Sequence, residues 1–196
     1  MPSDFQVSFL SDSELQAAHR SQYQNMPAAA AMGVVELQAW KARVAGFQAT
    51  VTETPAAVQG SLFEPESASA ADAIAPFQLP QQNTEFWRWR AADVGTAALY
   101  FVIDYQTMLL LYVGETVKSN QRWKGVHDCK RYLLNYRQIH YQLDLESQLG
   151  IAFWAQAPTE RRARQQLESA LIRKWRSPFN KENWAFWQTP FVGESL

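Results

Sequence analysis

Cysteine and histidine are scarce in this sequence. Of its 196 residues, only Cys129 is a cysteine and three are histidines. A single cysteine cannot form a disulfide within the chain, which fits a reducing compartment. Cys129 also lacks partners at the spacing of a zinc site. We therefore expect neither a disulfide framework nor a structural zinc centre, and we expect His19 and His140 to be surface or helix-capping residues.

Long apolar runs are absent as well. No stretch approaches the roughly 18 uninterrupted apolar residues that a membrane-spanning helix needs. The N-terminus, MPSDFQVSFLSDSELQ, has neither the cationic start nor the apolar run of a secretory signal. Hydrophobic residues still make up 47% of the chain, including 8 Trp and 11 Phe, which is enough for a packed core. The sequence thus predicts a soluble, cytoplasmic protein with no membrane partner.

The net charge of −1 hides an uneven distribution of charge. Residues 1–90 carry 5 Lys and Arg against 9 Asp and Glu, whereas residues 91–196 carry 13 against 10. In the second half, residues 118–137 hold six cations and one acid, and residues 160–181 hold seven cations and two acids. Local basic patches attract phosphates whatever the total charge. The alternative is that both are simply solvated helix faces.

Composition divides the chain into three parts. Residues 1–50 hold a capping-box pattern, SELQ at 13–16, and an apolar stripe at roughly helical spacing, which together predict a helical N-terminal region. The stripe consists of Met32, Val35, Trp40, Val44 and Phe47. Residues 51–85 are rich in Pro, Ser, Ala and Gln and predict a flexible linker. Residues 86–196 have the dense apolar patterning of a globular domain.

The globular part alternates strand and helix signals. Two apolar runs, AALYFVID at 97–104 and LLLYVG at 109–114, flank turn residues and predict a β-hairpin buried on both faces. A basic helix should follow from residue 119 or 120 to Tyr136, then a strand at 151–157. The last helix should run from an N-cap at Thr159 to Trp175. We expect an α/β (α+β) fold, with a small mixed β-sheet and flanking helices in β-β-α-β-α order.

Five short elements in this part resemble the GIY-YIG nuclease family. The two tripeptides that name the family stand here as Ala98-Leu99-Tyr100 and Tyr112-Val113-Gly114, one on each strand of the predicted hairpin. The remaining elements follow in the family's order: Arg122 on the basic helix, Glu168 on the last helix, and Pro178-Phe179-Asn180 after it. The resemblance covers about residues 88–188 and does not reach the first 85 residues.

The resemblance implies a metal-dependent endonuclease that hydrolyses DNA phosphodiester bonds, in DNA repair or recombination. It implies that Tyr100 and Tyr112 flank the attacking water, that Arg122 binds the phosphate, that Glu168 holds one Mg²⁺ or Mn²⁺, and that Asn180 belongs to the catalytic set. A planar guanidinium suits phosphate, and a tyrosine serves as a base only where its pKa of about 10 is lowered. The alternative is a catalytically inactive nucleic-acid-binding module of the same fold.

Several cations near these elements are candidate DNA contacts. They are Lys118, Lys124, Lys130, Arg131 and Arg164. Neutralising backbone phosphates is the sequence-independent part of DNA binding. We therefore expect these residues to contribute to DNA affinity and not to catalysis.

A short apolar pair interrupts the predicted linker. Gln59-Gly60-Ser61-Leu62-Phe63 resembles the Gln-x-x-Leu-Phe peptides by which bacterial DNA-repair and replication proteins hold the sliding clamp. Leu62 and Phe63 have no apolar neighbours that oblige them to pack, and a disordered segment offers such anchors to a partner pocket. We expect Gln59, Leu62 and Phe63 to bind a bacterial clamp. The alternative is that Leu62 and Phe63 dock on the protein's own domain.

Overall fold

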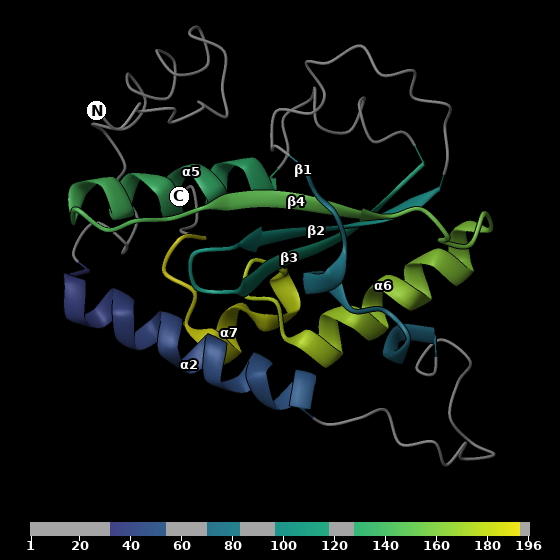
Figure 1. Ribbon diagram of the computed structural model, residues 1–196, viewed down its shortest axis with the longest axis horizontal. Helices are drawn as coiled ribbons and strands as arrows, with labels where there is room; N and C mark the ends of the chain where they lie inside the picture. The colour runs from purple at the N-terminus through teal and green to yellow at the C-terminus, as the bar shows by residue number, and fades with distance from the viewer. Residues whose placement is uncertain (1–31, 54–69, 83–96, 118–127, 193–196) are drawn as a thin grey trace, which may run out of the picture.

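The computed structural model describes residues 32–53, 70–82, 97–117 and 128–192. Helices cover both sides of a small sheet (Figure 1). The elements in chain order are α2 (Val34–Glu53), η2 (Pro76–Gln78), β1 (Gln81–Gln82), β2 (Ala98–Asp104), β3 (Leu109–Thr116), α5 (Asp128–Gln142), β4 (Leu149–Trp154), α6 (Arg161–Trp175), η4 (Lys181–Asn183) and α7 (Trp184–Trp187). The α/β fold and the β-β-α-β-α order are confirmed, as β2, β3, α5, β4 and α6. No helix within the described ranges is long and apolar enough to cross a membrane.

The four described strands form one sheet in the order β1-β4-β2-β3. Every pair in it is antiparallel, so the prediction of a mixed sheet is wrong for the described strands. The reason is the path of the chain after the hairpin. β4 runs in the same direction as β3, but it returns on the far side of β2 and pairs with β2, so the two co-directional strands never become neighbours.

The hairpin contains an irregularity that decides the position of the site. Ile103 pairs with Leu110, but Val102 pairs with Tyr112. Leu111 is therefore one extra residue in β3, a β-bulge. All seven residues of β2 are buried, as expected for a central strand whose two faces are both covered.

Two apolar clusters form the core, one on each face of the sheet. Successive side chains of a strand point to opposite faces, so β2 contributes to both clusters. The first cluster lies under α5 and takes in α2 and the C-terminal segment; it includes Leu37, Trp40, Tyr100, Val102, Tyr136, Phe179 and Phe191. The second cluster lies under α6; it includes Ile74, Leu99, Phe101, Ile103, Leu167, Leu171 and Trp175.

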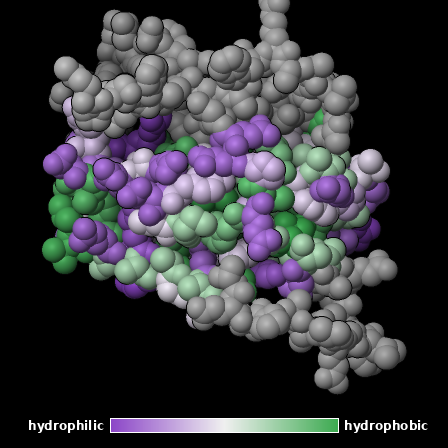
Figure 2. Space-filling model, viewed as in Figure 1, coloured by the Kyte–Doolittle hydropathy of each residue, from purple (hydrophilic) through white to green (hydrophobic). Residues whose placement is uncertain are grey.

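The N-terminal helix belongs to this core and is not a separate region. Leu37, Trp40 and Val44 of α2 are buried in the first cluster, so one helical stripe packs on the sheet and α5. The predicted stripe is wrong at Val35, which is 75% exposed. Leu37 takes that place because residues 37, 40 and 44 lie on one face at helical spacing. Polar and apolar side chains are interspersed on the surface seen in Figure 2.

The predicted linker is wrong for its described residues. Residues 51–53 complete α2, and residues 70–82 lie against the sheet and α6. Ala71 and Ile74 are buried, and β1 pairs with β4. Two apolar residues three positions apart are enough to hold this otherwise polar stretch against the sheet, because the outer edge of β4 offers backbone N–H and C=O groups as hydrogen-bond partners. The predicted clamp-binding segment, residues 59–63, lies outside the described residues.

The helices differ from their predicted bounds at the ends. α5 runs on to Gln142, beyond the predicted end at Tyr136, and residues 119–127 lie outside the described ranges. α6 begins at Arg161, with Glu160 and not Thr159 as its N-cap. The Glu160 carboxylate accepts hydrogen bonds from the backbone N–H groups of Arg162 at 2.8 Å and Ala163 at 2.6 Å. These bonds lower the pKa of Glu160.

Candidate active site

The bulge in β3 places Tyr112 beside Tyr100. In a regular register continued from the Ile103–Leu110 pair, Tyr112 would lie opposite Phe101 and share its face of the sheet. The extra residue moves Tyr112 opposite Val102, onto the face that carries Tyr100. The two rings are stacked, with centroids 5.8 Å apart and an interplanar angle of 30°. The structure thus brings the two predicted tyrosines together.

Gly114 is required for the close approach of Tyr100. The two residues are directly paired across the hairpin. A Cβ atom at position 114 would overlap the ring carbon Cζ and the hydroxyl oxygen of Tyr100. The Tyr100 ring therefore lies over the glycine, in the space that a side chain would fill. Such aromatic cover of a strand glycine stabilises a sheet.

A third ring completes the surroundings of Tyr100. Phe153 of β4 pairs with Tyr100 on the other side from β3, and the ring centroids lie 6.2 Å apart. Tyr100 is fully buried, whereas Tyr112 is only partly buried. Phe153 was not among the predicted site residues. The pairing of β4 with β2 could not be read from the sequence, because an apolar strand alone does not specify its neighbour.

Tyr112 is held in its protonated form by its neighbours. Burial raises its pKa most, and the nearby Tyr100, Cys129 and Glu168 raise it further. A hydrogen bond with Tyr100 also raises the pKa of Tyr112. The Glu168 carboxylate is therefore close enough to act on the phenol. Tyr100 and Tyr112 are in ring contact, and Glu168 acts electrostatically on Tyr112.

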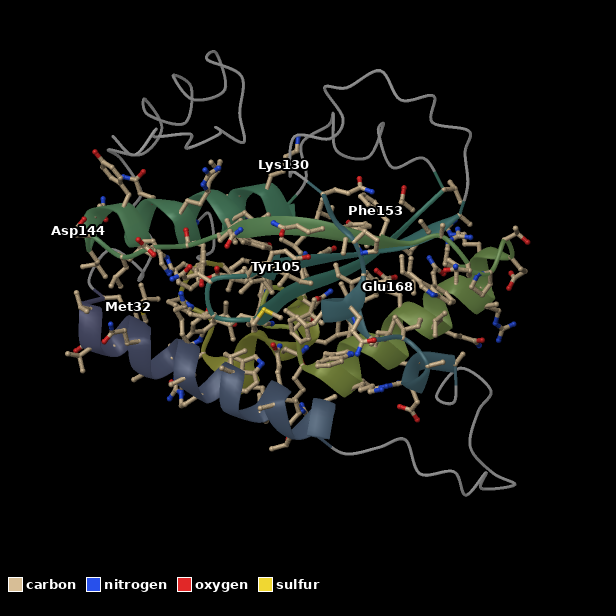
Figure 3. The ribbon with its side chains drawn as sticks, viewed as in Figure 1. Met32, Tyr105, Lys130, Asp144, Phe153 and Glu168 are labelled. Atoms are coloured by element: carbon tan, nitrogen blue, oxygen red, sulfur yellow. The ribbon has the colours of Figure 1, made fainter. Side chains whose placement is uncertain are left out.

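A buried ion pair positions Glu168. Arg164 is only 3% exposed, and its Nε donates to Glu115 of β3 at 2.5 Å. Its Nη1 donates to the carbonyl oxygens of Pro158 at 2.9 Å and Thr159 at 3.1 Å. This pair fixes α6 along β3, and Glu168 lies one helical turn after Arg164 on the same helix (Figure 3).

Arg164 therefore does not belong with the candidate DNA contacts. Its guanidinium is committed to Glu115 and to two carbonyl groups within the fold. The prediction treated Arg164 as one of several surface cations, because charge patterning alone cannot show which basic residue meets a buried acid. Its role is to position α6.

Asn180 acts on the backbone next to Tyr112. Its Oδ1 accepts from the N–H of Val113 at 3.0 Å, and its Nδ2 donates to the C=O of Val113 at 2.9 Å. The Ser177 hydroxyl donates to the same Oδ1 at 2.6 Å. The amide thus replaces a strand partner at the outer edge of β3. Asn180 is only 5% exposed, so the geometry gives it a positioning role between Tyr112 and Gly114.

Two of the predicted DNA contacts lie in the first turn of α5. Lys130 is largely buried, with 9% exposure. Arg131 is more open: its side chain is 46% exposed, lies 3.5 Å from the Asp128 carboxylate and stacks 5.3 Å from the centre of the Tyr132 ring. The other predicted residues of the site and its partners fall outside the described ranges; they are Gln59, Leu62, Phe63, Lys118, Arg122 and Lys124.

A buried polar cluster at the far end of β2 was missed. Asp104 is fully buried and not part of the turn. Its Oδ2 accepts from Lys41 Nζ at 3.1 Å and from the Tyr136 hydroxyl at 2.7 Å, and its Oδ1 accepts from the Gln148 N–H at 2.9 Å. Burial alone would raise the pKa of Asp104, but the Lys41 charge and these hydrogen bonds outweigh burial and lower it. The sequence feature that could have indicated this cluster is the single carboxylate at the end of an otherwise apolar strand.

His140 belongs to the same cluster, so its prediction as a surface or capping residue is wrong. It is 1% exposed. Its Nδ1 lies 2.7 Å from the carbonyl oxygen of Tyr136 and its Nε2 lies 3.0 Å from Lys41 Nζ. Nδ1 therefore carries the proton and donates, and Nε2 accepts from the ammonium. Burial, and then the Lys41 charge, lower the pKa of His140 to about 4.

The donor set beside Tyr112 suits a hard cation shared with a substrate. Among the described residues, no three His, Cys, Asp or Glu side chains gather as a metal site. Glu168 offers a single carboxylate that acts electrostatically on the Tyr112 phenol. Mg²⁺ commonly keeps several waters and is bound by one or two carboxylates plus substrate phosphates. One carboxylate is therefore compatible with a hard cation such as Mg²⁺ or Mn²⁺ that takes its remaining ligands from water and substrate.

The chain was compared with protein-family models, with curated proteins and with solved structures, and none of the three comparisons found a match.

Proposed function

We propose that this chain is a metal-dependent endonuclease that hydrolyses DNA phosphodiester bonds. The observation that supports this most is the convergence of Tyr100, Tyr112 and Glu168, which come from two strands and a later helix. These are residues on which the resemblance to GIY-YIG nucleases depends. Two hydrogen-bonded phenols beside a carboxylate are an unfavourable group to build into a core, and perturbed titrating groups of this kind concentrate at functional sites.

Each residue has a role in the proposed reaction. Glu168 would hold Mg²⁺ or Mn²⁺, which supplies positive charge where the departing oxygen becomes negative. Tyr100 and Tyr112 would orient the attacking water by hydrogen bonding. Because burial keeps the Tyr112 phenol protonated, the proton of that water would pass to bulk solvent and not to Tyr112. The water oxygen forms the new bond to phosphorus, and the bond from phosphorus to the leaving sugar oxygen breaks. Arg122, by the resemblance, binds the phosphate through its planar guanidinium.

Much of the fold serves to fix this group. Gly114 makes room for Tyr100, Arg164 sets the position of α6, and Asn180 holds Val113 next to Tyr112. Proximity of this kind is worth a large share of an enzymatic rate, because a displacement of about 1 Å can cost roughly 10²-fold. A module that binds nucleic acid without catalysis would need affinity, but it would not need its side chains to be positioned this closely.

The proposed substrate, DNA, approaches through the basic start of α5. Arg131 is exposed there, and the preceding residues add Lys118, Arg122 and Lys124 in sequence. We further propose a setting in DNA repair or recombination, with residues 59–63 as a tether to a bacterial sliding clamp. A tether raises the local concentration of the nuclease at DNA without a new catalytic contact.

The test is a panel of DNA substrates. Supercoiled, linear, branched and single-stranded DNA are incubated with the protein in Mg²⁺, in Mn²⁺ and in EDTA. We expect cleavage of at least one substrate with either ion and none with EDTA. Binding of DNA without cleavage of any substrate would contradict the proposal and support the inactive binding module.

A further inference from the structure

Gln48 of α2 joins three elements through one buried side chain. It is only 2% exposed. Its Nε2 donates to the C=O of Leu110 at 2.9 Å, and its Oε1 accepts from the N–H of Leu110 at 2.9 Å. The same Nε2 donates to the C=O of Trp175, the last residue of α6, at 3.2 Å. One amide therefore links α2, β3 and α6.

The position of this amide on β3 matters because β3 lies at the edge of the described sheet. Its outward N–H and C=O groups have no strand partner on that side. Gln48 takes both groups of Leu110, the N–H of Phe179 donates to the C=O of Leu111 at 2.9 Å, and Asn180 takes both groups of Val113. The edge on both sides of Tyr112 is thus held by contacts from outside the sheet.

Gln48 is bonded at the residue just before the bulge. Leu110 is the last residue of β3 in the register set by the turn, and Leu111 is the extra residue that moves Tyr112 onto the face of Tyr100. A slip of one residue would return Tyr112 to the opposite face. A bidentate amide at Leu110 opposes such a slip, because both of its bonds would have to break together.

The helix that carries Gln48 is itself firmly placed. Trp40 Nε1 donates to the C=O of Trp187 at 3.2 Å, and Lys41 forms its buried ion pair with Asp104 at the end of β2. These contacts lie two turns before Gln48 on the same helix. The amide is therefore presented to β3 by a rigid support.

We propose that Gln48 is a positioning residue for the proposed active site, holding the bulge that sets Tyr112 beside Tyr100 and tying β3 to the helix that carries Glu168. The inference rests on the proposed nuclease function. It makes α2, which lies outside the resemblance to the nuclease family, a part of the catalytic unit.

The test is Gln48→Met, which keeps the length of the side chain and removes its donor and acceptor. Gln38→Met is the matched control, because Gln38 is an exposed glutamine on the same helix. Two quantities are measured well below the unfolding temperature: kcat and KM for DNA cleavage, and the ¹⁹F NMR signal of fluorotyrosine at position 112, assigned with Tyr112→Phe.

We expect Gln48→Met to lower kcat by about tenfold or more with little change in KM, and to shift or split the Tyr112 signal. Gln38→Met should change neither. If Gln48→Met does not fold, Gln48→Ala takes its place: it also removes the three amide hydrogen bonds and should show an effect of the same kind.

The outcomes separate the two claims. A wild-type kcat together with a wild-type Tyr112 signal in the folded Gln48 variant overturns the positioning role. A loss of stability alone, with kcat and signal unchanged, also overturns it, because a purely structural residue would behave so. If wild-type protein cleaves no DNA, the proposed function fails, and the Tyr112 signal still decides whether Gln48 sets the position of that ring.

Discussion

Replacing Gly114 by alanine tests the packing of Tyr100 directly. The added Cβ would overlap the Cζ and hydroxyl oxygen of Tyr100, and the ring cannot swing freely because Phe153 and Tyr112 flank it. Forcing extra volume into a packed site costs about 1–3 kcal/mol. For a domain of this size that lowers the melting temperature by about 2–4 °C for each kcal/mol. The phenol must also move, so cleavage should fall even where the protein stays folded.

Gly46→Ala is the matched control. Gly46 lies within α2, and a Cβ there would meet nothing within 4 Å. Glycine in a helix interior is less favourable than alanine by roughly 0.5–1 kcal/mol. The same substitution should therefore stabilise the protein at position 46 and destabilise it at position 114. Urea or guanidinium unfolding measures both changes on one scale.

A double-mutant cycle assigns the cost to the ring. Tyr100→Ala alone should destabilise by about 3–5 kcal/mol, since it empties a buried aromatic site. With the ring gone, the added methyl group of Gly114→Ala has room, so its cost should fall close to zero. If Gly114→Ala costs the same with and without the Tyr100 ring, the overlap is not the reason for the glycine.

Three other predictions address the rest of the molecule. The pKa of His140 lies at about 4 in the fold against an ordinary value of 6.5, so between these values the unfolded chain binds a proton that the native protein does not. Stability should then fall by up to about 3 kcal/mol as the pH drops through this range, and His140→Gln should flatten the urea-unfolding profile; identical profiles would refute the assignment. Arg131→Ala should weaken DNA binding and reduce the salt dependence of the affinity by about one phosphate, whereas an unchanged slope would remove Arg131 from the interface. A peptide of residues 55–68 should bind a bacterial sliding clamp with a Kd in the micromolar range, and Leu62→Ala with Phe63→Ala should abolish this binding; no binding by the wild-type peptide would rule the contact out.

The elements of the fold followed from local patterns in the sequence. Apolar runs gave β2 and β3, and the helical stripe around Trp40 gave α2. The resemblance also predicts that Tyr100, Tyr112 and Glu168 act together, a spatial arrangement that no single pattern contains. Each of these depends on residues that are close in sequence or on a known order of motifs.

The features that position the site depend on pairings between distant residues. The bulge at Leu111 is set by which residues of β2 and β3 meet, and two uniformly apolar strands do not specify that register. Gln48 lies 62 residues from its partner Leu110, and a buried amide leaves no periodic signal. The charge of Arg164 looked like surface charge because its partner Glu115 lies on another element. The sequence therefore predicts the helices and strands better than it predicts the contacts that hold them together.

The central claim is tested most directly by Glu168→Gln in a plasmid-nicking assay. The substitution keeps the shape of the side chain and removes the charge that would hold Mg²⁺ or Mn²⁺. Glu182→Gln, at an exposed position, is the matched control. We predict that Glu168→Gln lowers the nicking rate by about 10²-fold or more while folding and DNA affinity stay near wild type, and that Glu182→Gln nicks normally. Nicking at the wild-type rate by Glu168→Gln would contradict the proposed mechanism.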